Sequence, residues 1–128
     1  MWRVLIAEDD PKTRETLVKG FKKTARCVSV ANGDEALKTY QAARNSKTPF
    51  DFILLDVTMP GTDGFEVLKT IRDQEEKNPH PLQKESRIIM ITAYKDSLLE
   101  NYNMGWDDFI TKPVDIKILT ERMRALTK

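Results

Sequence analysis

Short apolar runs alternate along the chain with longer segments in which apolar residues recur at helical spacing. The runs are rich in Val, Ile and Leu and are bounded by charged or turn-forming residues, which is typical of strands buried on both faces of a parallel sheet. They predict strands over residues 3–8, 27–31, 50–57, 87–93 and 108–112.

The segments between these runs predict helices. Asp10 stands directly before Pro11, as an N-cap residue stands before a proline at the first helical position. The stretch 73–86 is rich in charges and proline, and we expect it to form a surface loop. The apolar spacing predicts helices over about 11–25, 34–44, from 65 until this polar stretch, 96–104 and 115–128.

Five strands that alternate with five helices indicate an α/β fold. Such an order favours a single five-stranded parallel sheet with helices on both faces. The 128 residues are enough to bury a core, and they contain no repeat, linker or low-complexity segment. We therefore expect residues 1–128 to form one domain.

The composition excludes several classes of function. A net charge of +1 gives no reason to expect direct binding to nucleic acid. The chain has no apolar run long enough to span a membrane and no secretory signal, so the cytoplasm is the expected location and no membrane partner is expected. Cys27 is the only cysteine, which excludes an internal disulfide and a thiolate metal site; we expect it to be a small buried apolar residue.

The residues able to do chemistry stand at the ends of the expected strands. Glu8 and Asp9 end the first strand, and Asp56 ends the third. Thr92 and Lys112 stand at the ends of the fourth and fifth strands. In the strand order 2-1-3-4-5, the first and third strands flank the switch point, where parallel sheets bind ligands beyond their carboxyl ends. We therefore expect the three carboxylates to converge there.

Converging carboxylates repel one another unless a cation or a proton joins them. Oxygen ligands without His or Cys favour a hard cation, and Mg²⁺ fits because it binds one or two carboxylates together with water and phosphate oxygens. Lys112 and Thr92 would supply a positive charge and a hydroxyl to the oxygens of a phosphoryl group. Asp56 is the predicted nucleophile, which would form an aspartyl phosphate.

Each of these residues taken alone has a simpler interpretation. An acidic residue after a strand is more often a helix N-cap or a solvated carboxylate, and we expect Asp10 to be mainly a cap. A Lys-Pro pair such as Lys112-Pro113 is ordinary in turns. The presence at four strand ends of the groups that one phosphoryl site needs favours a common site.

These same residues resemble the receiver domains of two-component response regulators. Residues 4–10 (Val-Leu-Ile-Ala-Glu-Asp-Asp) are similar to the family's first strand and acidic pair, and residues 56–64 match its Asp-x-x-Met-Pro-x-x-x-Gly signature. Residues 91–93 (Ile-Thr-Ala) and 105–113 (Gly-Trp-Asp-Asp-Phe-Ile-Thr-Lys-Pro) are similar to its later motifs. The resemblance covers essentially the whole chain and implies the flavodoxin-like (βα)5 fold.

By this resemblance, Asp56 accepts a phosphoryl group from a sensor histidine kinase or a histidine phosphotransfer domain. Asp9, Asp56 and the backbone carbonyl of Thr58 would bind Mg²⁺ directly, and Glu8 would act through water. Lys112 would contact the phosphoryl oxygens, and its bond to Pro113 is expected to be cis.

The resemblance also implies a conformational switch. Thr92 would move towards the phosphoryl group and Phe109, which replaces a common Tyr, would rotate inward and reshape the surface of the fourth helix, fifth strand and fifth helix. Such a domain catalyses its own phosphorylation and slow dephosphorylation but is not an enzyme with a separate substrate. Thr58 and Tyr94 are the residues expected to modulate the phosphoryl lifetime. Trp106 stands where a small residue is usual, either as filler beside the fourth helix or as a partner contact.

Two rival functions use related chemistry or topology. A phosphatase of the haloacid dehalogenase type also forms an aspartyl phosphate, but it needs a second Asp two residues later, where this chain has Thr58. A flavodoxin-like cofactor binder needs a Ser-, Thr- or Gly-rich loop after the first strand, where this chain has Glu8, Asp9 and Asp10. The sequence leaves open the cognate kinase, the stimulus, the output, homodimerisation on phosphorylation, and whether the receiver stands alone or belongs to a larger regulator or hybrid kinase.

Overall fold

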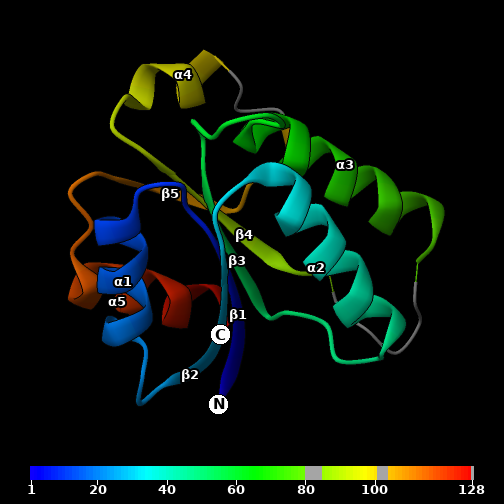
Figure 1. Cartoon of the computed structure of the whole chain (residues 1–128), viewed down its shortest axis with the longest axis horizontal. Coiled ribbons are helices and arrows are strands. Elements are labelled where there is room, and N and C mark those ends of the chain that lie inside the picture. Colours follow the sequence, from blue (N-terminus) through cyan, green and yellow to red (C-terminus); the bar gives the residue numbers. More distant parts are fainter. Residues whose placement is uncertain (80–84, 101–103, 128) are drawn as a thin grey trace.

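A computed structural model describes residues 1–79, 85–100 and 104–127, and in these residues five strands alternate with five helices (Figure 1). The strands are β1 (Trp2–Ala7), β2 (Ala25–Val30), β3 (Phe52–Asp56), β4 (Arg87–Thr92) and β5 (Asp108–Thr111). The helices are α1 (Pro11–Gly20), α2 (Gly33–Asn45), α3 (Gly64–Lys77), α4 (Lys95–Glu100) and α5 (Ile116–Leu126). Within the described residues, the helices are too short and too polar to cross a membrane.

The five strands form one parallel sheet in the order β2-β1-β3-β4-β5. The predicted α/β class, the single sheet and its strand order are therefore confirmed. The register places Ala7 of β1 beside Leu55 of β3, and Asp56 of β3 beside Ile91 of β4. The carboxyl ends of the central strands thus lie at one level, which brings the residues that follow them to the same edge of the sheet.

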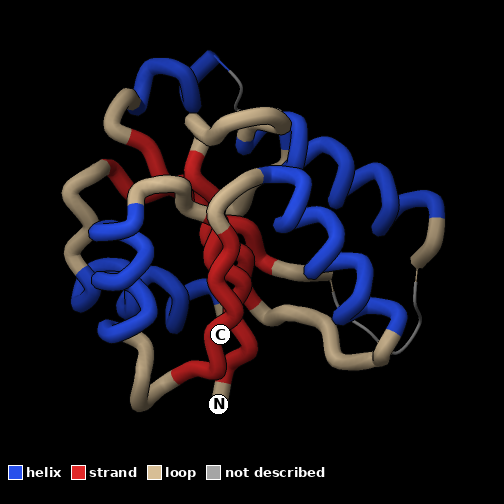
Figure 2. Tube along the Cα trace, in the orientation of Figure 1, coloured by secondary structure: helices blue, strands red, loops and turns tan. Residues whose placement is uncertain are grey.

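Helices cover both faces of the sheet (Figure 2). The side chains of α1 and α5 pack on one face in a core that includes Leu17, Phe21 and Leu119. The side chains of α2, α3 and α4 pack on the other face in a second core. β3 lies between these layers, and all five of its residues are buried, which explains why its sequence is a continuous apolar run ending in Asp56.

Side-chain caps determine where most of the helices begin. The carboxylates of Asp10, Asp63 and Asp115 and the amide oxygen of Asn32 each accept a hydrogen bond from a backbone N–H in the first turn of α1, α3, α5 and α2. These bonds satisfy N–H groups that have no partner within the helix. The prediction that Asp10 acts as a cap is confirmed, since its carboxylate also accepts a bond from the Thr13 hydroxyl at 2.6 Å.

The first helix ends five residues earlier than predicted, at Gly20 and not at Ala25. Phe21 and Ala25 lie at helical spacing, but Phe21 begins a turn and Ala25 begins β2; the Ala25 N–H donates to the Phe21 carbonyl at 2.9 Å. A Cβ atom on Gly20 would lie 2.7 Å from Ile116, so α1 ends where it packs closely against α5. The buried Phe21 belongs to the core on this face, and this burial explains an apolar spacing that continues past the helix.

The third helix continues to Lys77, so residues 73–77 of the predicted surface loop are helical. Although residues 73–77 are polar, one of them makes a buried contact: Glu75 is only 6% exposed and accepts a hydrogen bond from Arg72. Residues 80–84 of that loop and 101–103 of the predicted fourth helix lie outside the described residues. The strand boundaries differ from the prediction by no more than two residues. The same holds for the boundaries of the second and last helices within the described residues.

Arg72 joins three segments at the opposite edge of the sheet from the acidic strand ends. Its guanidinium donates to Glu75 at 2.5 Å, to the Ser86 carbonyl at 2.9 Å, and to the Gly105 carbonyl and Asp107 carboxylate, each at 2.9 Å. The Asp107 carboxylate also accepts the backbone N–H of Ile88 at 2.7 Å. One partly buried cation therefore fixes α3, the start of β4 and the chain that leads into β5.

We expect Arg72→Met to lower the free energy of unfolding by about 2–4 kcal/mol, because it leaves buried acceptors without their charged donor. Urea denaturation measures this change. Lys69→Met is the matched control, since Lys69 is exposed on the same helix, and it should change stability by less than about 0.5 kcal/mol. Equal effects of the two substitutions would show that the Arg72 network does not stabilise the fold.

Candidate functional site

Glu8 and Asp9 follow β1 directly, at the carboxyl edge of the sheet. The backbone N–H of Glu8 donates to the Val30 carbonyl at 3.1 Å, which extends the pairing with β2 by one residue. The Glu8 carbonyl accepts a bond from the Arg14 guanidinium at 2.8 Å, which ties this position to α1. The Glu8 side chain is fully buried, whereas Asp9 is less buried.

Asp56 is the last residue of β3 and is 3% exposed. Its Oδ1 atom accepts the backbone N–H of Thr58 at 3.3 Å, and the Gly64 N–H closes the following loop onto the Val57 carbonyl at 2.9 Å. A Cβ atom on Gly64 would lie 2.2 Å from the Asp56 carbonyl oxygen, so only glycine permits this approach. The start of α3 is therefore packed directly against the backbone of Asp56.

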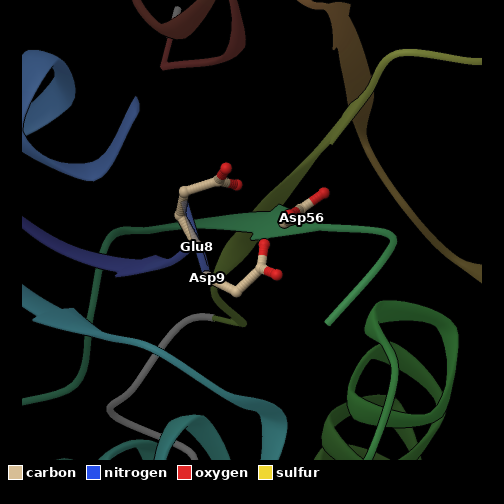
Figure 3. Close-up of side chains that lie close together, drawn as sticks. All are labelled: Glu8, Asp9 and Asp56. Atoms are coloured by element: carbon tan, nitrogen blue, oxygen red, sulfur yellow. The ribbon is translucent and has the colours of Figure 1, made fainter. Parts of the chain in front are cut away.

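The carboxylates of Glu8, Asp9 and Asp56 converge as predicted. Each offers an oxygen that lies within 4.8 Å of the others, and Figure 3 shows the three groups facing a common space. Lys112 reaches this cluster from the end of β5: its Nζ atom lies 2.7 Å from Glu8 Oε1 and 3.4 Å from Asp56 Oδ2. The predicted cis bond between Lys112 and Pro113 is present.

The electrostatics of this cluster are unfavourable for three ionised carboxylates. Burial, together with the hydrogen bond and negative charge of Glu8, raises the pKa of Asp56 to about 8. Partial burial opposes the charge of Lys112, but its bond to Glu8 and the nearby Asp56 raise its pKa above the usual value. One ammonium group thus faces two buried carboxylates and an additional carboxylate beside them.

The donor set fits a hard divalent cation. The cluster contains only oxygen ligands, and Glu8 Oε2 is buried without a hydrogen-bond partner among the described residues. A buried carboxylate oxygen without a partner is costly, and a hydrated cation would satisfy it. Mg²⁺ commonly binds to one or two carboxylates and retains several waters, which matches this arrangement.

Thr92 and Tyr94 stand at the end of β4 beside this edge. The Thr92 side chain is almost fully buried, and its hydroxyl accepts the backbone N–H of Tyr94 at 3.0 Å. Tyr94 is 75% exposed. The Thr92 hydroxyl also donates to the Tyr94 carbonyl at 3.3 Å. It is therefore bonded within its own loop, and its predicted move to a phosphoryl group would replace this donated bond.

Phe109 is half-buried and packs edge to face against Trp106, with ring centroids 5.7 Å apart. Both rings also contact the core on the α2–α3 face. Trp106 therefore packs against both the core and the predicted switch residue. The sequence allowed this pairing but did not reveal it, because the two residues lie three positions apart, one in an irregular segment and one in a strand.

Two contacts beside the site were not predicted from the sequence. Arg14 bonds to the Glu8 carbonyl, and Asp34 accepts a bond from Thr62 in the loop after β3. Arg14 and Asp34 both lie at exposed or half-exposed helical positions, where a charged residue usually signals only a solvated surface. Without the tertiary contact, no periodicity or motif distinguishes them.

Comparisons with known proteins agree with this geometry. The sequence profile described as response regulator receiver domain matches residues 4–124. The transcriptional regulatory protein ResD of Bacillus subtilis is 32% identical over 98% of this chain, and the matched region is 48% of ResD. The chain thus spans about half the length of this relative. That residues 1–128 act as a single domain stays a prediction.

Two solved structures resemble this one closely. The chemotaxis response regulator CheY4 of Vibrio cholerae is 26% identical, with a TM-score of 0.81 over 98% of both chains. The receiver domain of sensor histidine kinase PA1611 from Pseudomonas aeruginosa is 24% identical, with a TM-score of 0.80 over 97% of this chain and 95% of that one. The latter structure is described with a magnesium ion coordinated in its active-site cleft.

The raised pKa of Asp56 predicts how stability depends on pH without divalent cations. A carboxyl whose pKa rises from 3.8 to about 8 on folding contributes its full stabilisation when the pH is below 3.8. This contribution is lost as pH rises towards the upper value. Asp56→Asn removes this titrating group. The free energy of unfolding of the variant, relative to that of the natural chain, should therefore be higher at pH 8 than at pH 5 by on the order of 2 kcal/mol. Urea denaturation in a chelator measures the difference, and parallel pH profiles of the two proteins would contradict the assignment.

Proposed function

Because the chain belongs to the response regulator receiver domain family, we propose that Asp56 is the phosphoacceptor of a Mg²⁺-dependent signalling switch. Members of this family act in two-component phosphorelays, and receiver domains are switches and not classical enzymes. The observation that carries the proposal is the bridging position of Lys112, whose Nζ contacts Glu8 and Asp56 within one cluster of three carboxylates.

We assign the magnesium ligands from the resemblance to receiver domains, and the cluster of Glu8, Asp9 and Asp56 supports the assignment. The carboxylates of Asp9 and Asp56 and the backbone carbonyl of Thr58 would hold the ion directly, and Glu8 would act through a bound water. When bound, the ion neutralises the clustered carboxylates and the oxygens of the phosphoryl group. The receiver domain of PA1611, which has the same fold, is described with a magnesium ion coordinated in its active-site cleft.

In the phosphoryl transfer, an Asp56 carboxylate oxygen attacks the phosphorus of the donor. A P–O bond forms to Asp56 as the donor's P–N bond breaks, when the donor is a phosphohistidine of a kinase or phosphotransfer domain. Lys112 is already 3.4 Å from Asp56 Oδ2 and needs little movement to stabilise the phosphoryl oxygens. The Thr92 hydroxyl supplies a further donor at the end of β4.

The same step would operate the switch. Thr92 exchanges its bond with Tyr94 for one with the phosphoryl group, and Phe109 moves into the space beside it. Phe109 also lines a groove on β5 and α5 with Ile118 and Arg122, so its movement changes the surface there. We propose this α4–β5–α5 surface as the region whose change transmits the signal to an output protein or domain.

The rival functions lack support in the site. Asp56 ends β3 and is followed two residues later by Thr58, so the acid–base Asp of a haloacid dehalogenase phosphatase is missing from its required position. The acidic segment 8–10 after β1 would repel the phosphate of a flavin. Slow autodephosphorylation of Asp56 is therefore the only hydrolysis that we propose.

We expect acetyl phosphate with Mg²⁺ to add one phosphoryl group to the protein, because the site itself supplies the nucleophile and the charge stabilisation. Intact-protein mass spectrometry detects the addition. Asp56→Asn should abolish it, and a chelator should do the same with the natural chain.

The control Asp73→Asn removes a carboxylate from an exposed position of α3 and should be phosphorylated normally. Phosphorylation that persists in the Asp56→Asn variant would place the acceptor elsewhere. A folded natural chain that gains no mass would contradict the proposed activity with small donors.

Tyr94 is the second residue after Thr92 and is 75% exposed at the edge of the site. Its ring would obstruct the water that attacks the phosphoaspartate in line, so Tyr94→Ala should shorten the phosphoryl lifetime by about 2- to 10-fold. Following the loss of the phosphorylated mass after removal of the donor measures this lifetime. An unchanged or longer lifetime in the variant would rule out this role for Tyr94.

A further inference from the structure

The loop between β3 and α3, residues 57–63, is held at its base and at its tip. At the base, the Gly64 N–H donates to the Val57 carbonyl at 2.9 Å. At the tip, the Thr62 hydroxyl donates to Asp34 Oδ1 on α2 at 2.6 Å. This second bond joins residues that are 28 positions apart in the sequence. None of the phosphoryl-transfer steps proposed above involves it.

The tip of the loop is packed closely on the first turn of α2. A Cβ atom on Gly33 would lie 2.0 Å from the Thr62 carbonyl oxygen, so the two backbones touch without an intervening side chain. Gly61 has φ +73°, a left-handed conformation that turns the chain at this point. A Cβ atom there would lie 3.7 Å from Asp34 Oδ2, which places Asp34 beside the turn.

Asp34 itself stands on a fixed element. It is the second residue of α2, and the helix begins at a reciprocal cap between Asn32 and Glu35. In this cap, Asn32 Oδ1 accepts the Glu35 N–H at 2.9 Å, and the Asn32 amide donates to the Glu35 carboxylate at 3.1 Å. The Asp34 carboxylate is therefore an acceptor at a defined position, against which the loop can be held.

Thr58 lies between the two attachment points of this loop. Its side chain is exposed, and its N–H donates to Asp56 at 3.3 Å. The direction of its carbonyl consequently depends on the shape of the whole loop. A metal ligand needs such an orientation to be fixed by surrounding groups, since a loosely held ligand lowers affinity.

We propose that Asp34 is a positioning residue for the metal site, which acts by holding the Thr62 hydroxyl and thereby the loop that presents the Thr58 carbonyl. This inference rests on the proposed function, because it assigns Thr58 as a magnesium ligand. Asp34 does not touch the metal or the phosphoryl group. Its contribution is to keep the metal-free loop in the shape that the bound state requires.

Thr62→Val is the sharpest test, because it removes the hydroxyl while keeping the shape and net charge of the chain. The loss of one such hydrogen bond should weaken Mg²⁺ binding by about 2- to 10-fold. Thr62→Ser retains the hydroxyl and should stay within about twofold of the natural affinity. Isothermal titration calorimetry with MgCl₂ on the full chain measures each dissociation constant.

Phosphorylation by acetyl phosphate gives a second observable. In the Thr62→Val variant the rate should fall at low Mg²⁺ and recover at saturating Mg²⁺, since the substitution acts on metal binding. Asp34→Asn, which keeps an acceptor oxygen, should bind Mg²⁺ more tightly than Asp34→Ala. Equal losses in these two variants, with no loss in Thr62→Val, would show that the charge of Asp34 acts and would overturn the proposal.

Urea denaturation in a chelator separates positioning from a merely structural role. If Thr62→Val lowers the free energy of unfolding but leaves the Mg²⁺ dissociation constant unchanged, the bond only supports the fold and the proposal is wrong. Failure of the proposed function would give a different result, because the natural chain itself would then bind no Mg²⁺ or gain no phosphoryl group.

Discussion

The repulsion among Glu8, Asp9 and Asp56 is the constraint on which the rest of the site depends. Three carboxylates meet at one edge of the sheet, and within the described residues Lys112 is the cation that contacts two of them. In isolation this arrangement is unfavourable, because burial and the negative charge of Glu8 oppose ionisation of Asp56 and raise its pKa. The same arrangement favours binding of a positive charge at the cluster, and it places Asp56, the proposed nucleophile, next to that charge.

The fold tolerates this unfavourable cluster because the strands that carry it are well packed. β3 is buried along its whole length, and Gly64 lets the start of α3 pack directly against the Asp56 backbone. Arg72 fixes the opposite edge, where β4 and β5, the strands that lead to Thr92 and Lys112, begin. The acidic edge can then carry this electrostatic repulsion without loss of the native state, which is a common relation between stability and function.

Much of this could be predicted from the sequence. The alternation of apolar runs and helical spacing gave the number, order and kind of the elements, and the residues at the strand ends gave the acidic cluster. The end of α1 was misplaced because Phe21 and Ala25 continue its apolar spacing, although they pack in the core from a turn and from the start of β2. The end of α3 was misplaced because the burial of Glu75 depends on Arg72 and Ser86. The bond between Asp34 and Thr62 could not be predicted, since contacts between distant exposed residues leave no periodic signal.

The central claim is that the carboxylate cluster is a divalent-cation site, and the most direct test is the effect of Mg²⁺ on the free energy of unfolding. When the free Mg²⁺ concentration is 10 to 100 times the dissociation constant, binding should stabilise the native state by about 1.4–2.7 kcal/mol. Asp9→Asn should remove most of this gain, whereas a carboxylate lost from the exposed surface, as in Asp73→Asn, should leave it intact. A natural chain whose stability does not respond to Mg²⁺, or an Asp9→Asn variant that responds fully, would contradict the account.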